Sequence, residues 1–237
     1  MKVAVTKLRE KDKGTVRLFA EYGHTAYLTP TIRSKKPDDP SSLRRLLGEI
    51  KKAQVDYLIF TSSLGVTYFF DECDHLDTTI TIISIGPETA RSVRENGFST
   101  EMLPAYSSEH FSQYLHGRAL GKTIGVARAG VPNTELIRSL EDLGARVIEG
   151  ICYELVSAGN GLKDLVTNSQ IDAVVFTSSK SFHSSNLTEN DLLNIITVAI
   201  GPKTADTMAK SGTEPDITGT GTLESCAREL NIYKKYK

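Results

Sequence analysis

Small hydroxyl residues and glycines are the residues of this sequence best placed to do chemistry. They stand directly after apolar runs, in the stretches Thr61-Ser62-Ser63, Gly86-Pro87, Tyr106-Ser107-Ser108, Thr177-Ser178-Ser179, Gly201-Pro202 and 218–222. If the runs are parallel strands, ligands collect beyond their carboxyl ends, where the next helices begin. Free N–H groups and a partial positive charge at a helix start favour a carboxylate or a phosphate there. The stretches therefore predict a site for an anionic small molecule.

The same residues have a second, purely structural interpretation. Ser and Thr at a helix start cap its first N–H groups and stabilise the helix by about 1 kcal/mol each, with no ligand present. Gly86 and Gly201 can serve only to permit a turn, and Pro87 and Pro202 only to begin a helix. For each hydroxyl, capping and ligand binding both remain open.

An internal repeat positions these stretches. Residues 56–63 recur as 172–179, 116 positions later, and residues 85–90 recur as 200–205, 115 positions later. A weaker similarity links the segment from residue 2 to Gly23 with the segment from residue 123 to Gly144, and the two glycines are 121 positions apart. Ordered landmarks at nearly constant spacing indicate a duplication.

Each repeated unit alternates short apolar runs with amphipathic stretches. Nearly continuous apolar runs of this length are typical of strands buried on both faces of a parallel sheet; they are 3–6, 57–60, 80–85, 123–126, 173–176 and 195–200. Helical spacing occurs at 41–52, 88–95, 108–115, 133–143, 203–210 and 223–230. The alternation predicts an α/β protein with two doubly wound parallel-sheet domains.

Composition narrows the function classes. The 237 residues suit one large or two small domains, and 39% apolar with 24% charged residues is typical of globular proteins. A net charge of −1 without a basic tract argues against a nucleic-acid-binding protein. The early charges at the N-terminus and the absence of a long apolar run predict a cytoplasmic protein without a membrane segment.

Several familiar catalytic patterns are missing from the sequence. Cys73, Cys152 and Cys226 are far apart, which argues against a disulfide framework and a structural zinc site. The five histidines are scattered, and there is no dinucleotide fingerprint, phosphate loop, nucleophile elbow or His-Glu-x-x-His motif. An enzyme without these catalytic patterns should act mainly by holding a reactive substrate in the conformation that reacts.

The ordered set of landmarks resembles uroporphyrinogen-III synthases over essentially the whole chain. The resemblance rests on the two Phe-Thr-Ser-Ser strand ends, the duplicated Ile-Gly-Pro-x-Thr-Ala, the segment from Tyr106 to Glu109 ahead of a helix, and Tyr153. It implies two flavodoxin-like domains joined by two connecting strands. One domain would comprise residues 1–32 and 154–237, and the inserted domain residues 33–153, with the connectors near 27–33 and 150–155.

The resemblance also implies an activity. Members of the family cyclise the linear tetrapyrrole hydroxymethylbilane, invert its terminal D ring and release water, with no metal or organic cofactor. The substrate carries eight carboxylates and closes unaided to the wrong isomer, so the enzyme has to favour one ring-closing geometry by positioning and electrostatics. The implied partners are this small molecule and, transiently, hydroxymethylbilane synthase; the implied state is a monomer.

Individual residues receive roles from the resemblance. Tyr153 matches the family tyrosine proposed to assist departure of the hydroxyl, and a phenol pKa near 10 would keep it a proton donor at neutral pH. A core tyrosine with its hydroxyl at the surface is the alternative. Lys7 stands where many bacterial members have Arg, so the bidentate fork is lost there. The expected substrate contacts are Lys7, Thr61, Ser62, Ser63, Gly86, Thr89, Ser107, Ser108, Arg128, Thr177, Ser178, Ser179, Gly201 and Thr204.

Two other functions compete with this one. A hinged pair of α/β lobes also suits a non-catalytic sensor or binding protein for an anionic small molecule such as a tetrapyrrole. A degenerate family member that binds tetrapyrroles without turnover is the other alternative.

Overall fold

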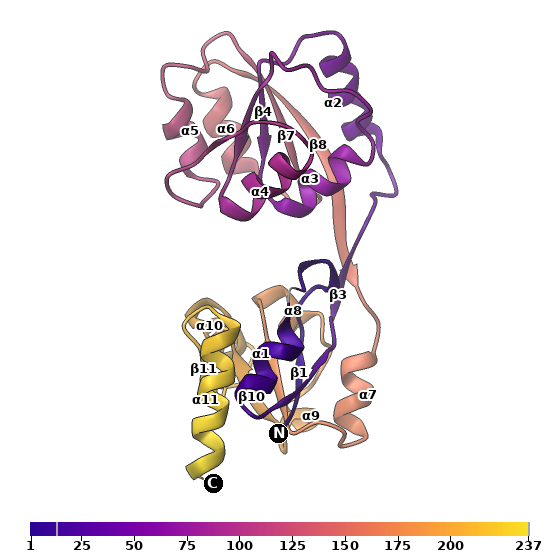
Figure 1. Cartoon of the computed structure of the whole chain (residues 1–237), viewed down its shortest axis with the longest axis vertical. Coiled ribbons are helices and arrows are strands. Elements are labelled where there is room, and N and C mark those ends of the chain that lie inside the picture. Colours follow the sequence, from indigo (N-terminus) through magenta and orange to yellow (C-terminus); the bar gives the residue numbers. More distant parts are fainter. Residues whose placement is uncertain (13, 237) are drawn as a thin grey trace. The chain divides into compact units, whose positions relative to one another are not determined.

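The computed structural model describes residues 1–12 and 14–236 and divides the chain into two compact units. Unit 1 comprises Met1–Arg33 and Val156–Lys237, and unit 2 comprises Ser34–Leu155. The chain therefore leaves unit 1 within strand β3 (Ile32–Lys35) and returns to it within strand β8 (Arg146–Ser157). Both strands are labelled in Figure 1.

Unit 1 contains a five-stranded sheet in the order β11-β10-β9-β1-β2. All of its neighbouring strands pair in parallel. The strands are β1 (Lys2–Val5), β2 (Thr25–Leu28), β9 (Ala173–Phe176), β10 (Ile196–Ala199) and β11 (Ile217–Thr218). Every residue of β9 is buried, as the continuous apolar run predicts for a central strand.

Helices cover both faces of this sheet. Helices α1 (Thr15–Glu21) and α11 (Leu223–Tyr236) pack together, and Phe19 and Leu230 join Val3 and Val5 in one core. The other core holds Ala4 and Met208. Its helices are α7 (Gly161–Thr167), α8 (Ser179–His183), α9 (Glu189–Leu192) and α10 (Pro202–Lys210). A 3₁₀ turn, η1 (Arg9–Lys11), follows β1.

Unit 2 has a six-stranded sheet in the order β3-β8-β7-β4-β5-β6. Its further strands are β4 (Tyr57–Phe60), β5 (Thr81–Ser84), β6 (Glu101–Met102) and β7 (Thr123–Ala129). From β8 to β6 the pairs are parallel. Without β3, the order repeats that of unit 1, with β7 in the place of β1 and β8 in the place of β2.

Helices again flank the sheet of unit 2. Helices α5 (His110–Leu115) and α6 (Thr134–Glu141) bury Phe111, Leu136 and Leu140 against one face. The remaining helices are α2 (Ser41–Lys51), α3 (Ser63–Phe70) and α4 (Pro87–Glu95). Leu46 of α2 lies so close to β7 and β8 that a Cβ at Gly125 or Gly150 would come within 2.7 Å of its methyl groups. The two glycines therefore let α2 pack tightly on the sheet.

The strand registers align the two units residue by residue. Val5 of β1 pairs with Val175 and with Leu28, while Val126 of β7 pairs with Ile59 and with Glu149. Because Ile59 and Val175 are equivalent in the repeat, the equivalent pairs are Lys7 and Arg128, Leu28 and Glu149, and Ile32 and Tyr153. All three pairs are 121 positions apart, the offset of the weaker sequence similarity.

The α/β fold with parallel sheets predicted from the sequence is confirmed. Strands β4 and β9 have the predicted bounds. Helix α5 begins at His110, two residues later than predicted, so Ser107 and Ser108 lie in the turn before it. Among the described residues, no helix has the length and apolar character needed to cross a membrane.

Candidate functional site

Tyr153 and Ser62 meet at the carboxyl ends of the central strands of unit 2. Tyr153 lies in β8 beside Ala129, the last residue of β7, and its Oη is 3.1 Å from Oγ of Ser62. Ser62 is the N-cap of α3, and its Oγ accepts a hydrogen bond of 3.0 Å from the N–H of Gly65. A serine hydroxyl has one hydrogen and two lone pairs. Ser62 can therefore cap the helix and still donate to the phenol, which leaves the phenol hydrogen free for a ligand.

The ring of Tyr153 is buried and held in place. Its relative exposure is 5%, and it stacks on Tyr68 of α3 with ring centroids 5.5 Å apart. Tyr68 in turn donates a hydrogen bond of 2.9 Å to Ser34. Burial is the main cause that raises the pKa of Tyr153, against the opposing effect of the Ser62 hydrogen bond. The phenol therefore keeps its proton throughout the neutral range.

The neighbouring strand-end residues of unit 2 fill mainly structural positions. The N–H of Thr61 donates to the carbonyl of Ala127, and Ser63 is the first residue of α3. Gly86 caps α4, and the ring of Tyr106 lies against it, 3.4 Å from where a Cβ would stand. Thr89 is buried in the first turn of α4.

Arg128 is engaged within unit 2. Its guanidinium forms an ion pair with Glu149 and donates to the carbonyls of Ala129 and Val131, at 2.7 Å each. Ser108 accepts a hydrogen bond of 3.2 Å from Asn133. Arg128, Asn133 and Glu149 contribute to the wall of a cavity of about 210 Å³. Because Glu149 offsets its charge, Arg128 is a weaker candidate for binding a substrate carboxylate than the sequence suggests.

Three of the expected contacts in unit 1 line one cavity. Lys7, Thr177 and Ser178 belong to a cavity of about 420 Å³ beyond the carboxyl ends of β1, β9 and β10. Ile32, Ile200 and Gly221 form other parts of its wall. Gly221 has a φ of +99°, a left-handed conformation in which a side chain would be strained. Within the residues that the structure describes, Lys7 has no ion pair or hydrogen bond from its ammonium group.

A network of hydroxyls connects Thr6, Thr177 and Ser178 of this cavity wall. Ser178 caps α8 in a capping box with Ser181, and Oγ1 of Thr6 lies 3.0 Å from Oγ of Ser181. Oγ1 of Thr177 donates to the carbonyl of Thr6 at 3.2 Å. These hydroxyls have partners already, so they contribute mainly to the shape and polarity of the cavity.

The remaining expected contacts of unit 1 lie outside this cavity wall. Ser179 meets Thr207 of α10 at 2.8 Å between the hydroxyl oxygens. Gly201 caps α10, and a Cβ there would come within 3.2 Å of the N atom of Gly221. Thr204 is buried in the first turn of α10. Like their unit 2 counterparts Gly86 and Thr89, Gly201 and Thr204 build the helix start.

Tyr68 and Ser34 are the residues of the Tyr153 site that sequence reasoning missed. Tyr68 is distant from Tyr153 in sequence, and Ser34 lies in β3. A usable signal was the aromatic cluster Tyr68-Phe69-Phe70 at the end of α3, because the repeat places Ser184 and Ser185, just beyond α8, at the positions equivalent to Tyr68 and Phe69.

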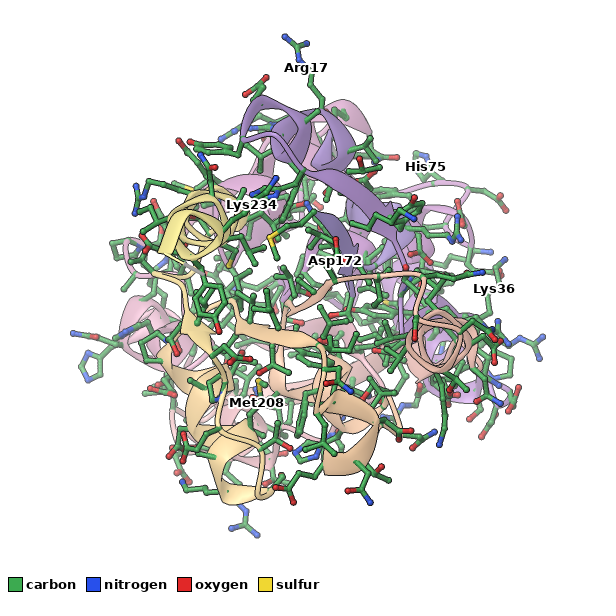
Figure 2. All side chains as sticks on the ribbon, turned by 90° about the horizontal axis from the view of Figure 1, so that it is seen from below. Arg17, Lys36, His75, Asp172, Met208 and Lys234 are labelled. Atoms are coloured by element: carbon green, nitrogen blue, oxygen red, sulfur yellow. The ribbon has the colours of Figure 1, made fainter. Side chains whose placement is uncertain are left out.

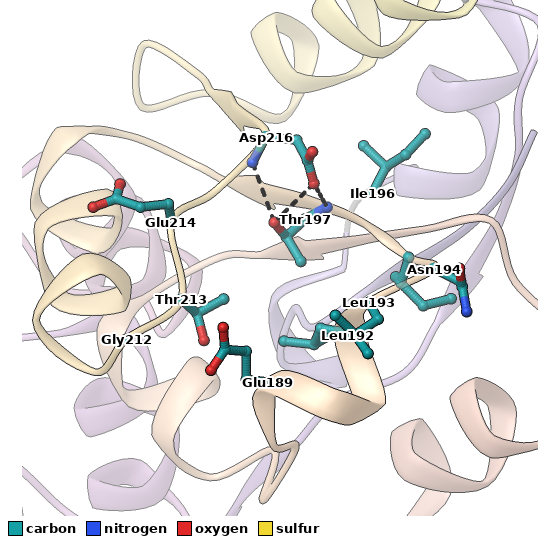
Figure 3. A pocket seen from close by; sticks show the side chains of 11 residues that line it. Glu189, Leu192, Leu193, Asn194, Ile196, Thr197, Gly212, Thr213, Glu214 and Asp216 are labelled. Atoms are coloured by element: carbon teal, nitrogen blue, oxygen red, sulfur yellow. Dashed lines mark hydrogen bonds between the residues drawn. The ribbon is translucent and has the colours of Figure 1, made fainter.

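A larger cavity of about 550 Å³ lies at the opposite, amino edge of the unit 1 sheet. Figure 3 shows its wall, where Asp216 accepts hydrogen bonds from the N–H and the hydroxyl of Thr197. Glu189 and Glu214 are further carboxylates on this wall. Three acids and no lysine or arginine make this cavity unsuitable for an anion. The described residues contain no group of three His, Cys, Asp or Glu side chains that could hold a metal ion.

Comparison with known proteins gives a consistent result. The model of the family described as "Uroporphyrinogen-III synthase HemD" matches residues 13–230. A mutant uroporphyrinogen III synthase from Thermus thermophilus is 20% identical, with a TM-score of 0.63 and 100% of each chain covered. The uroporphyrinogen-III synthetase from Helicobacter pylori is 15% identical, with a TM-score of 0.65, and 100% of this chain and 99% of that one are covered. No curated protein sequence matches the chain significantly.

Proposed function

The chain belongs to the uroporphyrinogen-III synthase family, the hydro-lyases that cyclise hydroxymethylbilane, and we propose that it divides this reaction between two strand-end sites. In the proposal, Tyr153 of unit 2 moves the proton, and the cavity around Lys7 in unit 1 binds carboxylates of the substrate. The observation that carries the proposal is the buried phenol of Tyr153, whose oxygen lies 3.1 Å from the hydroxyl oxygen of Ser62.

Proton transfer by Tyr153 accounts for the loss of water. As the hydroxymethyl C–O bond breaks, the phenol donates its proton, so the hydroxyl leaves as water instead of hydroxide. Inversion then requires a bond exchange at ring D. The methylene carbon freed by the loss of water bonds to the ring D carbon that already carries the bridge to ring C, that bridge bond breaks, and the bridge re-forms at the unsubstituted carbon of ring D. This last carbon releases a proton, which returns to the phenolate. The tyrosine thus ends the cycle protonated, and protons balance without any other acid.

Positioning accounts for the choice of isomer. The linear substrate closes unaided to isomer I, so the protein has to hold the chain in the geometry that leads to the inverted ring D. Lys7 supplies a positive charge that no carboxylate of the described residues neutralises, and the N–H groups at the start of α10 add partial positive charge nearby. The eight carboxylates of the flexible substrate can pair with Lys7 and with these N–H groups.

The decisive test uses freshly generated hydroxymethylbilane. The purified protein is incubated with it, the products are oxidised, and the porphyrin isomers are separated chromatographically. We expect isomer III to form faster than the spontaneous background. Isomer I alone, at the spontaneous rate, would instead favour a tetrapyrrole-binding protein without turnover.

We also propose that the two units are the two domains of the enzyme, joined through β3 and β8, and that the protein acts as a monomer in the cytoplasm. Membership of the family supports these points. Sedimentation at several protein concentrations tests the monomer, with and without hydroxymethylbilane synthase to reveal a transient contact.

A further inference from the structure

A second cavity of unit 1 lies beside the Lys7 cavity at the same edge of the sheet. It measures about 250 Å³, and its wall includes Leu28, Thr29 and Pro30, which follow from the end of β2. The N–H of Thr29 donates to the carbonyl of Val5 at 2.9 Å, which places this cavity beyond the carboxyl ends of β1 and β2. Ile32 lines both cavities, so they are neighbours along one edge.

Two arginines give this cavity its charge. Arg9 of η1 and Arg33 of β3 are both exposed and both line it. Within residues 1–12 and 14–236, neither guanidinium has an ion pair or a hydrogen bond. Glu10 is the one acidic residue of the wall, and it has an interaction of its own.

In contrast to Arg9 and Arg33, other arginines of the chain have their charge neutralised by a neighbouring carboxylate. Arg118 makes two hydrogen bonds of 2.9 Å to Glu101, and Arg128 pairs with Glu149. Arg9 and Arg33 keep their five N–H donors each for a ligand. A planar guanidinium matches the two oxygens of a carboxylate, and this bidentate geometry makes the pairing strong and directional.

We propose that Arg9 and Arg33 form a carboxylate-binding subsite that holds acidic side chains of the linear tetrapyrrole; this rests on the proposed function. The Lys7 cavity and the arginine cavity together then form a row of positive charges along the β10-β9-β1-β2 edge. Leu28, Pro30 and Ile32 supply an apolar wall on which the pyrrole rings or the methylene arms of the acids can pack.

The test compares Arg9→Gln, Arg33→Gln and the double variant with wild type. Arg17→Gln is the matched control, because Arg17 of α1 is exposed and extends away from the ribbon in Figure 2. Its guanidinium pairs with Glu21 of the same helix. We expect KM for hydroxymethylbilane to rise on the order of tenfold for each cavity arginine, with kcat unchanged. Arg33→Lys should recover part of the loss, because lysine keeps the charge but not the fork.

Ionic strength gives a second readout that a purely structural role would not change. The KM of wild type should rise with salt, and that of the double variant should rise less, because screening acts on charges that the variant lacks.

Equilibrium binding separates this inference from the proposed function. Fluorescence titration compares uroporphyrin III, with eight carboxylates, and coproporphyrin III, with four, in wild type and double variant. Failure of wild type to make isomer III would contradict the proposed function, while weaker binding of uroporphyrin by the double variant would still support the subsite. An unchanged KM together with an unchanged affinity for uroporphyrin would overturn the subsite, as would an equal loss in Arg17→Gln.

Discussion

The carboxyl ends of the equivalent strands in units 1 and 2 have the same backbone arrangement but different side chains. Three equivalent residue pairs account for the difference. Unit 2 has Arg128, Glu149 and Tyr153 where unit 1 has Lys7, Leu28 and Ile32. In unit 2 the acid neutralises the cation, and the tyrosine brings a phenol to the N-cap of α3. In unit 1 an apolar residue replaces the acid, so the cation stays available. In the proposed function, a few side-chain changes after a duplication make one edge a proton donor and the other a carboxylate-binding edge.

The N-cap serines Ser62 of unit 2 and Ser178 of unit 1 also differ in what their hydroxyls contact. Ser178 is closed in a reciprocal capping box with Ser181, which itself contacts Thr6. Ser62 has no such box, and its hydroxyl faces Tyr153 in addition to the N–H of Gly65. Both serines cap helices, as the structural interpretation of the sequence predicts, and Ser62 also contacts the proposed acid.

The largest expected effect comes from removing the phenol of Tyr153, whose equivalent position in unit 1 is Ile32. Tyr153→Phe keeps the ring that stacks on Tyr68 but deletes the proton donor, so kcat should fall by about 10²- to 10⁴-fold. Affinity for the product and the circular dichroism spectrum should stay as in wild type. Turnover equal to that of wild type would remove Tyr153 from the mechanism.

Charge deletion at the equivalent cations should separate binding from stability. Lys7→Gln is expected to raise KM on the order of tenfold and leave the free energy of unfolding unchanged. Arg128→Gln should leave KM unchanged and lower the free energy of unfolding by about 2 kcal/mol, since Glu149 and two carbonyls lose their donor. Steady-state kinetics and urea unfolding measure the two quantities. Identical responses of the two variants would contradict the proposed division.

A weaker perturbation gives unit 1 the acid of unit 2. Leu28→Glu should place a carboxylate near Lys7, as Glu149 stands near Arg128, and raise KM by up to about fivefold. Leu28→Gln has a similar size without the charge and serves as the control. If both variants change KM equally, packing at this position matters rather than charge.

The smallest expected effect is a larger loss of stability at acid pH in unit 1 than in unit 2. His24 of unit 1 is buried, its Nε2 lies 3.1 Å from the carbonyl of Ala227, and burial is the main cause that lowers its pKa. The unfolded chain therefore takes up a proton below about pH 6.5 that the folded unit does not, and stability falls as the pH drops from there. The histidines of unit 2, His75, His110 and His116, are not buried.

Hydrogen exchange at pH 7 and pH 5.5 checks this expectation. Protection should fall more in β1 and α11 of unit 1 than in β7 of unit 2, and His24→Gln should remove most of the difference. Equal loss in both units, or an unchanged difference in the variant, would contradict the role of His24.

Much of the fold could be predicted from the sequence because its strands are buried on both faces. The run at residues 173–176 has no polar residue, so its assignment did not depend on alternation. Short elements were missed: α9 has four residues, and β6 and β11 have two each. Such elements carry too few residues for a period to show, and tertiary contacts decide their form.

The candidate site could be predicted only in part. The repeat and the resemblance point to Ser62, Tyr153 and Lys7, but sequence alone does not show that Glu149 lies beside Arg128. That neighbour depends on the register between β7 and β8, which are separated by α6. Arg9 and Arg33 belong to no motif, and only the folded edge of unit 1 brings them to one cavity.

Because unit 2 is inserted between two segments of unit 1, the strands of the unit 1 sheet are synthesised at widely separated times. Strand β1 is made first, but it pairs with β9, and 170 residues separate Lys2 from its hydrogen-bond partner Asp172. At about 5–20 residues per second, a ribosome needs roughly 10–30 s to cover that distance. Unit 2 is one uninterrupted stretch and is complete earlier. The nascent chain must therefore keep its first apolar strand from pairing wrongly until the last third of the chain has emerged.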